Sequence, residues 1–454
     1  MTTGPRIETW SSNLSFYLSI AGAAVGLGTL WRFPFLAGQH GGGLFVLVFV
    51  VACILIAVPL LTAEYLLGRR GGPNVPLGAG RVASASGLSS RWAAIGVLGT
   101  LAIFLIMTYY SVIGGWVFSY VEAYATGAVS GLSHAEITAR FNALLADPWR
   151  LTFWHAAFMA ATVAVSSAGL HRGIEVANKI MMPGLFGILL GLAIYALNQG
   201  DAGRAIAFLT HVDFSQLSGE MVLAAVGQAF FATGVGMAIM IAYGSHVGPA
   251  TSLPKSAGIV VISIILASVL CSLLIFPLVF GSGVDPAQGP QLAFIVLPSI
   301  FIGMPGGTVV GTLFFVLLAF AALSSSIAGL DPAGGWLMER FGLRRAPAVA
   351  IVAAVAWLLG LATVLSFNHW SGVHPLGGIE RFKSSTIFDL TDFFASNVLL
   401  PVGALLTSLL VGWRLDRAVI AGDFGVHPRV RVVLLVLLRY LCPLAIVGVL
   451  VSAL

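Results

Sequence analysis

The sequence predicts an all-α membrane protein with eleven transmembrane helices, two of them interrupted. Hydrophobic residues make up 58% of the 454 residues, and charged residues only 9%. A soluble domain carries about 25% charged residues, so this composition indicates a protein with many membrane spans. Its apolar segments reach about 20 residues or more, the length of a spanning helix, whereas barrel strands alternate over about 10 residues. We therefore expect a helical bundle.

Eleven segments have the length and composition of membrane helices. The expected spans are 12–37, 42–69, 91–124, 151–169, 174–197, 221–244, 255–281, 307–340, 346–366, 386–413 and 430–452. Two shorter apolar pieces, near 205–218 and 290–303, are expected to be surface helices in outer loops. The first apolar run is too long for a signal-peptide core, so it should remain as a span.

Lysine and arginine predict the orientation in the membrane. One set of connecting segments contains Arg6, Arg69, Arg70, Arg81, Arg91, Arg172, Lys179, Lys255, Arg340, Arg344, Arg345, Arg414, Arg417, Arg429 and Arg431. The opposite set contains Arg140, Arg150, Arg204, Arg381 and Lys383. This excess places the N-terminus in the cytoplasm and the C-terminus outside. The sequon Asn13-Leu14-Ser15 lies inside the first span, and the short outer loops favour a bacterial inner-membrane protein.

The first span contains an unusual run from Gly22 to Pro34. Glycines stand at positions 22, 26 and 28, and the run closes on Arg32-Phe33-Pro34. This pattern predicts a helix broken near the middle of the membrane, whose freed backbone groups face a substrate and an ion. Such groups cost several kcal/mol each in lipid unless they find partners. The alternative for Gly22-x-x-x-Gly26 is a close helix–helix contact.

A second interruption resembles the first. Val25-Gly26-Leu27-Gly28 in the first span is similar to Val235-Gly236-Met237-Ala238 in the sixth. Each lies in the first helix of a block of five, and the two blocks enter the membrane from opposite sides. Paired glycine-interrupted spans predict a transporter with its site at the repeat interface. We expect one domain, 1–454, with repeat one at about 12–197, repeat two at about 221–413 and an extra helix at about 430–452.

The run from Gly22 to Pro34 resembles helix 1 of the neurotransmitter:sodium symporter family, whose fold is named for a bacterial leucine transporter. Further matches are Gly41-Gly42-Gly43, Pro59-Leu60, Glu64, Gly68-Arg69, Tyr109-Tyr110, Trp116, Gly173-Ile174-Glu175, Met182-Pro183, Ala225 to Phe231, Leu323 to Ala328 and Asp392. The resemblance implies a sodium-coupled secondary symporter that works by alternating access, not an enzyme. It also implies a small-molecule substrate and a site built on helices 1, 3, 6 and 8.

The resemblance implies how a substrate is held. The amides of Gly26, Leu27 and Gly28, at the positive end of a half-helix dipole, are expected to bind a carboxylate. Monoamine-transporting members carry an aspartate in place of Gly26, so glycine here favours an amino acid. Tyr110 is expected to donate its hydroxyl to the same carboxylate. Apolar and small residues complete the expected pocket and favour a neutral, hydrophobic side chain: Ala24, Ile106, Phe230, Phe231, Gly234, Met237, Ser325 and Gly329.

The resemblance also implies sodium sites, of which one matches. Oxygen ligands for this hard cation are expected from Gly22, Val25, Ala321, Ser324 and Ser325. The other sodium site departs from the family, because Thr29 and Ala232 replace side-chain ligands and the position near Ile264 is apolar. We therefore expect one sodium ion per substrate.

The chloride site of the family is also incomplete in this sequence. Ser268 and Gln228 fit it, but Phe49 replaces a tyrosine and Ala232 removes a hydroxyl. We therefore expect no chloride requirement.

Charged residues near the ends of the interrupted helices predict gates. Arg32 and Asp392 are the expected outer pair, and Arg6 and Glu339 the expected inner pair. Arg6 stands one residue further from Trp10 than the family spacing R-x-x-W. Glu64, an acid well inside an apolar span, is expected to bind amides freed by the break in helix 6.

Other functions stay open as alternatives. A proton-coupled or sodium-independent carrier is possible because Glu64, Asp331 and His246 can titrate, and the substrate can be another zwitterion such as taurine or a betaine. A receptor or channel fits the inverted repeat and the two gate pairs less well. The sequence shows no nucleophile–base pair, metal cluster or phosphate loop of an enzyme. The expected partners are the substrate and the lipid bilayer, without nucleic acid, in a monomer or weak dimer.

Overall fold

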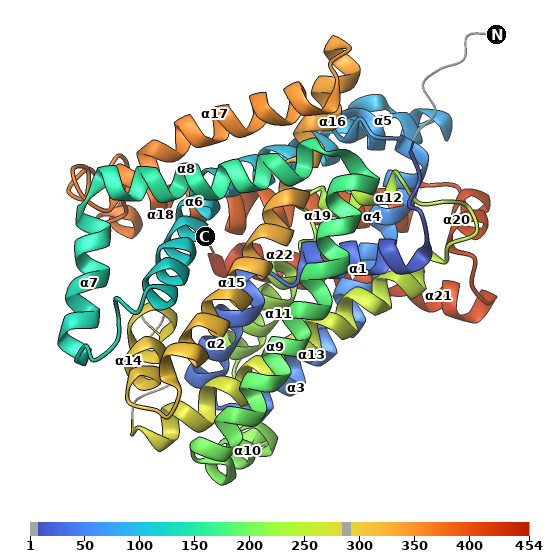
Figure 1. Cartoon of the computed structure of the whole chain (residues 1–454). Coiled ribbons are helices and arrows are strands. Elements are labelled where there is room, and N and C mark those ends of the chain that lie inside the picture. Colours follow the sequence, from blue (N-terminus) through green and yellow to red (C-terminus); the bar gives the residue numbers. More distant parts are fainter. Residues whose placement is uncertain (1–7, 284–291, 454) are drawn as a thin grey trace.

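The computed structural model describes residues 8–283 and 292–453, which form a bundle of helices without a β-strand. Helices α5 and α16 lie at one end of the bundle, and α10 and α14 lie at the opposite end (Figure 1). We call these ends the N-side and the far side. The α-helices are α1 (Asn13–Ala24), α2 (Phe33–Gln39), α3 (Gly43–Ala52), α4 (Val58–Gly71), α5 (Val75–Ala85), α6 (Ala94–Ala125), α7 (His134–Ala146), α8 (Pro148–Ser167), α9 (Val176–Gln199), α10 (Ala202–Thr210), α11 (Gly219–Thr233), α12 (Ile239–Gly244), α13 (Leu253–Gly281), α14 (Leu297–Ile302), α15 (Gly307–Gly329), α16 (Asp331–Phe341), α17 (Arg345–Ser366), α18 (Ile387–Asp392), α19 (Leu400–Leu409), α20 (Arg417–Phe424), α21 (Pro428–Val436) and α22 (Cys442–Ala453).

Short π-helical and 3₁₀-helical segments join many of these helices. The π-helical segments are η1 (Gly28–Arg32), η2 (Cys53–Ala57), η4 (Leu170–Glu175), η6 (Leu292–Val296), η8 (Phe393–Leu399), η9 (Leu410–Arg414) and η10 (Leu437–Leu441). The 3₁₀ segments are η3 (Ser90–Ala93), η5 (Phe214–Gln216) and η7 (Glu380–Phe382). A π-helical turn often marks a functional site within a helix, and η1 is the segment of this kind at the centre of the molecule.

Eight helices in the described part of the chain are long and apolar enough to cross a membrane, or nine with the bent first pair counted as one span. The eight are Gly43–Gly71, Ser90–Ala125, Leu170–Gln199, Leu253–Gly281, Gly307–Phe341, Arg345–Ser366, Ile387–Arg414 and Pro428–Ala453. All nine coincide with predicted spans to within a few residues. The other two predicted spans correspond to α8 and to the pair α11 and α12, which are helical but do not meet the same length and hydropathy criteria.

The first span is broken, as its glycines predict. Helix α1 ends at Ala24 and η1 begins at Gly28, with a bend of 58° between the two parts. The amide of Gly26 donates to the carbonyl of Ala24 at 2.9 Å, a tight turn that takes the place of the helical pattern. The Leu27 amide is left without a partner in its own chain segment and donates instead to the Tyr110 hydroxyl at 3.5 Å.

The sixth span is broken between α11 and α12. Gly234 and Gly236 have φ angles of 67° and 85°, in the left-handed region that glycine adopts without cost. Ala238 has a φ of 59°, and it is the one non-glycine residue with positive φ among those described. A side chain in this region costs about 1–2 kcal/mol, which surrounding contacts must offset. Both interruptions in the sequence therefore correspond to real breaks.

Both pieces predicted as surface helices are helical, but only the first lies at the surface, because all residues of η6 and half of those of α14 are buried. The piece near 205–218 forms α10 and η5, and the piece near 290–303 forms η6 and α14, although residues 290 and 291 lie outside the described residues. Helices α5, α7 and α20 were not predicted. For α7 the sequence carried a signal, because Ser133 and Glu136 form a capping box.

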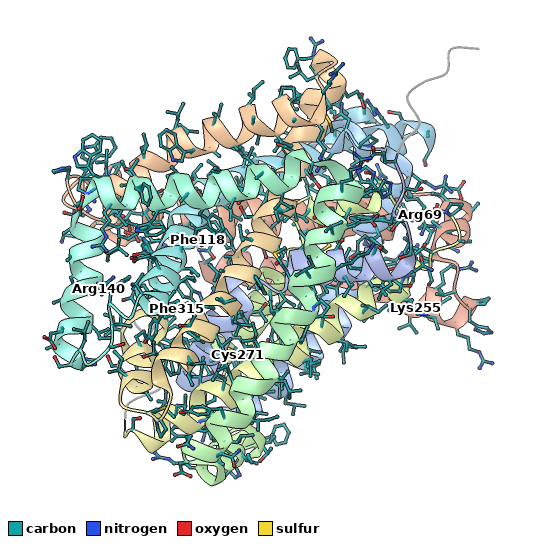
Figure 2. All side chains as sticks on the ribbon, in the orientation of Figure 1. Arg69, Phe118, Arg140, Lys255, Cys271 and Phe315 are labelled. Atoms are coloured by element: carbon teal, nitrogen blue, oxygen red, sulfur yellow. The ribbon has the colours of Figure 1, made fainter. Side chains whose placement is uncertain are left out.

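The two predicted sets of Lys and Arg residues can be compared at three residues that Figure 2 labels: Arg69, Arg140 and Lys255. Arg69 and Lys255 lie toward the end that carries α20, whereas Arg140 lies on the side that carries α7 (Figure 2). Arg69 and Lys255 belong to the larger set of cations and Arg140 to the smaller one. The two sets are therefore separated along the molecule in these three cases.

Candidate functional site

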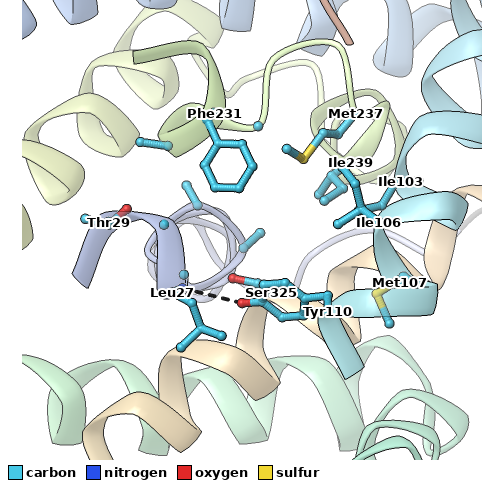
Figure 3. A pocket seen from close by; sticks show the side chains of 16 residues that line it. Leu27, Thr29, Ile103, Ile106, Met107, Tyr110, Phe231, Met237, Ile239 and Ser325 are labelled. Carbon is cyan, nitrogen blue, oxygen red and sulfur yellow. Dashed lines mark hydrogen bonds between the residues drawn. The ribbon is translucent and has the colours of Figure 1, made fainter. Parts of the chain in front are cut away.

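A central pocket lies between the two helix breaks. Its volume is about 60 Å³, and its walls come from the α1–η1 break, α6, the α11–α12 break and α15 (Figure 3). The lining residues are Ala23, Ala24, Gly26, Leu27, Gly28, Thr29, Ile103, Ile106, Met107, Tyr110, Phe231, Ala232, Gly234, Met237, Ile239 and Ser325. Ten of these residues belong to the predicted substrate site: Ala24, Gly26, Leu27, Gly28, Ile106, Tyr110, Phe231, Gly234, Met237 and Ser325.

The polar end of the pocket is formed by Leu27, Tyr110 and Ser325. The amide of Leu27 donates to the Tyr110 hydroxyl over a long distance of 3.5 Å (Figure 3). A Cβ atom on Gly26 would lie 2.7 Å from Ser325 Oγ and 3.2 Å from Tyr110 Oη, so glycine leaves this space open. A backbone amide and two hydroxyls that converge beside a half-helix start suit a carboxylate or another anion.

The remainder of the pocket is apolar. Phe231 and Met237 come from the α11–α12 break, and Ile103, Ile106 and Met107 come from α6 (Figure 3). No Asp, Glu, Lys or Arg is among the lining residues, all of which lie in the described part of the chain. This end therefore suits a neutral hydrocarbon side chain.

The prediction missed six lining residues. These are Ala23, Thr29, Ile103, Met107, Ala232 and Ile239. A signal for two of them was present in the sequence, because Ile103 and Met107 lie at helical spacing from Ile106 and Tyr110 and therefore share their face.

Two predicted residues do not line the pocket. Phe230 precedes Phe231 on α11, and consecutive helical side chains point about 100° apart, so Phe230 is buried in another direction. Gly329 lies behind α6: a Cβ there would lie 2.7 Å from Met107 Sδ and 3.4 Å from Ile103 Cδ1. The prediction expected the substrate to fill the space beside Gly329. The Met107 side chain occupies that space instead.

The predicted sodium residues come together where α1 packs against α15. Ser325 Oγ lies 3.4 Å from the carbonyl oxygen of Gly22, and Ser324 Oγ donates to the carbonyl of Ala321 at 3.1 Å. Val25 is the C-cap residue that directly follows α1. We call the five residues the sodium cradle: Gly22, Val25, Ala321, Ser324 and Ser325. Its donors are carbonyl and hydroxyl oxygens, the ligand type that fits a hard cation.

At the positions of the predicted incomplete sodium and chloride sites, Gln228 Oε1 and Ser268 Oγ are buried and have no hydrogen-bond partner among the described residues. Thr29 is fully buried and its Oγ1 has no hydrogen-bond partner among the described residues. Gln228 Nε2 donates to the carbonyl of Gly28 at 2.9 Å, while Ala232 and Ile264 offer only hydrocarbon. Phe49 packs against Phe33 with ring centroids 4.7 Å apart and offers no hydroxyl.

A vestibule adjoins the central pocket. This second cavity has a volume of about 340 Å³ and is lined by Leu27, Gly28, Trp31, Arg32, Phe35, Tyr109, Tyr110, Ile113, Phe231, Phe388 and Asp392. Leu27, Gly28, Tyr110 and Phe231 line both cavities. Phe231 and Tyr110 therefore stand between the two, as an aromatic lid would.

The predicted outer pair faces the vestibule without direct contact. The guanidinium of Arg32 lies 4.8 Å from the centre of the Phe231 ring. Asp392 instead accepts hydrogen bonds from Tyr109 at 2.7 Å and from Ser396 at 3.0 Å. Arg32 and Asp392 are not among the ion pairs found in residues 8–283 and 292–453. The Arg32 guanidinium thus lies over the Phe231 ring. The Asp392 carboxylate, at the end of α18, is hydrogen-bonded to Tyr109 of α6.

Glu64 bridges to the sixth span as predicted. Its Oε1 accepts a hydrogen bond of 2.7 Å from the amide of Gly236, a group freed by the break. The Glu64 side chain is fully buried. This hydrogen bond ties α4 to the loop that carries Met237.

Only Glu339 of the predicted inner pair lies within the described residues. Arg6 lies outside the described residues. Glu339 pairs with Arg81 of α5 and accepts a hydrogen bond of 3.1 Å from Asn74. Helix α16 packs directly against α5, which brings Arg81 to Glu339.

The N-side is closed by the segment before α1. The indole of Trp10 donates to the carbonyl of Tyr243 at 3.1 Å, and the Trp10 amide donates to the carbonyl of His246 at 3.2 Å. His246 Nδ1 lies 2.7 Å from the carbonyl oxygen of Glu8, and burial lowers the pKa of this histidine. Asp331 pairs with Arg345. His246 therefore stays neutral at pH 7 and is engaged in the closure.

Comparisons with known proteins agree with this geometry. The family model described as the sodium:neurotransmitter symporter family matches residues 7–136 and 138–413. An uncharacterized sodium-dependent transporter of Bacillus subtilis is 35% identical over 442 residues, which cover 96% of each chain. A sodium- and chloride-dependent taurine transporter of Rattus norvegicus is 25% identical and aligns with 90% of this chain and 71% of its own length. A crystal structure of MhsT in complex with L-phenylalanine has a TM-score of 0.89 and 36% identity, over 98% of this chain and 100% of the other.

Proposed function

Because this chain belongs to the sodium:neurotransmitter symporter family, we propose that it imports a neutral, hydrophobic amino acid together with one sodium ion. It is a sodium-dependent membrane transporter and not an enzyme. The observation that carries the proposal is the division of the central pocket. One end holds the amide of Leu27 and the hydroxyls of Tyr110 and Ser325, and the remainder is hydrocarbon.

The substrate class follows from that division. The carboxylate binds at the polar end, and the side chain fills the space between α6 and the α11–α12 break. The similar structure of MhsT contains L-phenylalanine, which supports a hydrophobic amino acid here. The cavity of about 60 Å³ is compact, and the thioethers of Met107 and Met237 can change conformation to admit larger side chains.

One sodium ion supplies the driving force in this proposal. One charge moved through 100 mV yields about 2.3 kcal/mol, and a tenfold sodium gradient adds about 1.4 kcal/mol. Together they support roughly 500-fold accumulation, and a second ion would square this ratio. The departures from the family's ligand residues at Thr29 and Ala232 support the single-ion stoichiometry. Phe49 and Ala232 support transport without chloride.

The remaining features of the proposal concern the whole chain. The N-side faces the cytoplasm of a bacterial cell, and the far side faces outward. Repeat one extends over about 12–197, repeat two over about 221–413, and the last helix is an addition. Arg32 and Asp392 close the outer path, while Glu339 acts on the inner path. The transporter works as a monomer or weak dimer.

A proton-coupled carrier is the second candidate. Glu64 is fully buried, and its Oε2 has no hydrogen-bond partner among the described residues. An uncompensated carboxylate in a membrane helix can exchange a proton during transport. Uptake that remains complete in sodium-free buffer would favour this candidate over sodium coupling.

A binding screen tests the proposed substrate. Purified protein is heated with each of the twenty common amino acids, with and without Na⁺. We expect Leu, Ile, Met, Phe or Trp to raise the melting temperature only when Na⁺ is present, because ligand binding stabilises the folded state. Stabilisation by Asp, Glu, Lys or Arg instead would contradict the hydrophobic pocket.

A further inference from the structure

Two buried oxygens near the sodium cradle lack a partner. Ser19 on α1 and Asn178 on α9 are both fully buried. Ser19 Oγ and Asn178 Oδ1 make no hydrogen bond within residues 8–283 and 292–453. Buried polar atoms without a protein partner usually bind a water or an ion. These two atoms therefore mark a place for a ligand.

The orientation of Asn178 is fixed by its own helix. Its Nδ2 donates to the carbonyl of Ile174 at 2.9 Å, so the amide oxygen points the other way. That oxygen lies against Gly22: it is the nearest atom to the place where a Cβ on Gly22 would stand, and Ser324 Cβ lies 3.2 Å from the same place. Asn178 Oδ1 is thus aimed at the border of the sodium cradle.

Ser19 approaches the same region from α1. Residues three apart on a helix share a face, so Ser19 lies below Gly22 on the side nearer the N-terminus. One helical turn further, Ser15 Oγ lies 3.0 Å from Ser11 Oγ, and the Ser11 amide donates to Glu175 at 2.9 Å. Polar atoms therefore continue from the cradle toward the N-side along the contact between α1 and α9.

The mouth of this polar path is open to solvent. Glu175 is only 1% exposed, but its partners His171 and Lys179 are each 46% exposed. The polar atoms along this contact therefore end at side chains that are exposed on the N-side. Each buried member offers an oxygen, the ligand atom that Na⁺ prefers.

We propose that Ser19 Oγ and Asn178 Oδ1 form a separate cation-binding position, which the sodium ion occupies after it leaves the cradle. This rests on the proposed sodium coupling through the cradle. The position lies about one helical turn, or about 5 Å, from the cradle. Two cations at this separation repel each other, so one ion moves between the positions and they are not filled together. Neither residue carries a charge, so the ion is held briefly and released.

The test separates sodium release from sodium binding. The variants are Asn178→Leu and Ser19→Ala, each in the full chain in proteoliposomes. Asn198→Leu is the matched control, because Asn198 makes the same hydrogen bond to its own helix, to Ile194 at 2.7 Å, but on an exposed surface. Two quantities are measured: the initial rate of sodium-driven uptake, and the sodium concentration that gives half-maximal substrate binding at equilibrium.

We expect both variants to slow uptake about tenfold, the effect of one lost oxygen ligand to a cation. Their half-maximal sodium concentration should stay within about twofold of the unaltered protein, because the cradle keeps its own ligands. Asn178→Asp, which has almost the same shape, should lower that concentration about tenfold or more, because a carboxylate holds the ion. If Asn178→Leu does not fold, Asn178→Asp still tests the role of Asn178.

Three results would overturn the proposal. The first is normal uptake by Asn178→Leu and Ser19→Ala. The second is an increase in half-maximal sodium as large as that of Ser324→Ala, which would make Asn178 part of the cradle itself. The third is an Asn178→Asp protein with unchanged sodium affinity, which would leave only a bound water. Sodium-independent binding by the unaltered protein is a different result, since it contradicts the proposed function.

Discussion

At the scale of residues, the site depends on small groups that leave room for others. Gly26 leaves the space in which Ser325 and Tyr110 present their hydroxyls, and Gly28 allows the Phe231 ring to pack on η1. The polar end of the pocket therefore exists because two side chains are absent. Substitutions here should alter binding more than folding.

Removal of the Tyr110 hydroxyl should weaken substrate binding. In Tyr110→Phe the substrate carboxylate loses one hydrogen bond to a charged group, which is worth about 1.5–3 kcal/mol, or about 10- to 150-fold in Kd. Tyr195→Phe is the control, because Tyr195 donates to Pro305 far from the pocket. Equilibrium binding of the radiolabelled amino acid measures the change. An unchanged Kd for Tyr110→Phe would show that the carboxylate binds elsewhere.

A methyl group on Gly28 should displace the lid. A Cβ there would lie 2.6 Å from Phe231 Cδ1, closer than such atoms pack. We expect Gly28→Ala to lower uptake about tenfold or more, since a displacement of about 1 Å can cost two orders of magnitude. Gly227→Ala is the matched control, because nothing lies within 4 Å of its added Cβ. Equal uptake rates for the two variants would contradict a role for the lid position.

The sequence predicted the residues that a local pattern or the family resemblance can mark. The glycines, Tyr110 and Ser325 were found in this way. Ile103 and Met107 were missed although each lies three residues before a predicted residue, Ile106 or Tyr110, because their shared helix face was not used in the prediction. Phe230 and Gly329 were placed wrongly relative to the pocket, since side-chain direction and the filling of space behind a glycine depend on neighbouring helices.

At the scale of elements, the two breaks require partners from other helices. The amide of Gly236 is freed by the break in the sixth span and donates to Glu64 on α4. Gln228 on α11 donates in turn to the carbonyl of Gly28 in the first span. Each break is therefore stabilised by a hydrogen bond from a different helix. Such bonds satisfy backbone groups that have no access to water inside the membrane.

Loss of the Glu64 carboxylate should destabilise the sixth span. Glu64→Ala leaves the Gly236 amide buried without a partner, at a cost of about 1–3 kcal/mol. Thermal unfolding in detergent should therefore show a lower melting temperature, and Glu64→Gln, which keeps an acceptor oxygen, should restore most of it. A Glu64→Ala protein as stable as the original would mean that the hydrogen bond contributes nothing.

The elements were predictable to the extent that they are long and apolar. All eleven expected spans correspond to helical segments, with ends that differ by a few residues. Helices α5 and α20 escaped prediction because they are too short to span a membrane, with 11 and 8 residues. The left-handed conformation of Ala238 could not be predicted, because alanine disfavours it and only the surrounding contacts impose it.

At the scale of the whole molecule, the pocket adjoins a vestibule on one side, and the opposite side is closed by the segment before α1. Phe231 separates the pocket from a vestibule of about 340 Å³. On the N-side, Trp10 and Ser11 bind the ends of α12 and η4. Glu339 pairs with Arg81, 258 residues away in sequence, a choice of partner that no local pattern could reveal. This arrangement suits an outward-facing step of alternating access.

The ratio of sodium to amino acid transported tests the central claim most directly. Uptake of ²²Na⁺ and of a labelled hydrophobic amino acid is measured in the same proteoliposomes under a fixed membrane potential. One complete cradle predicts a flux ratio near one and no uptake by Ser324→Ala, which loses a cradle oxygen. A ratio near two, or undiminished uptake by Ser324→Ala, would contradict coupling through the cradle alone.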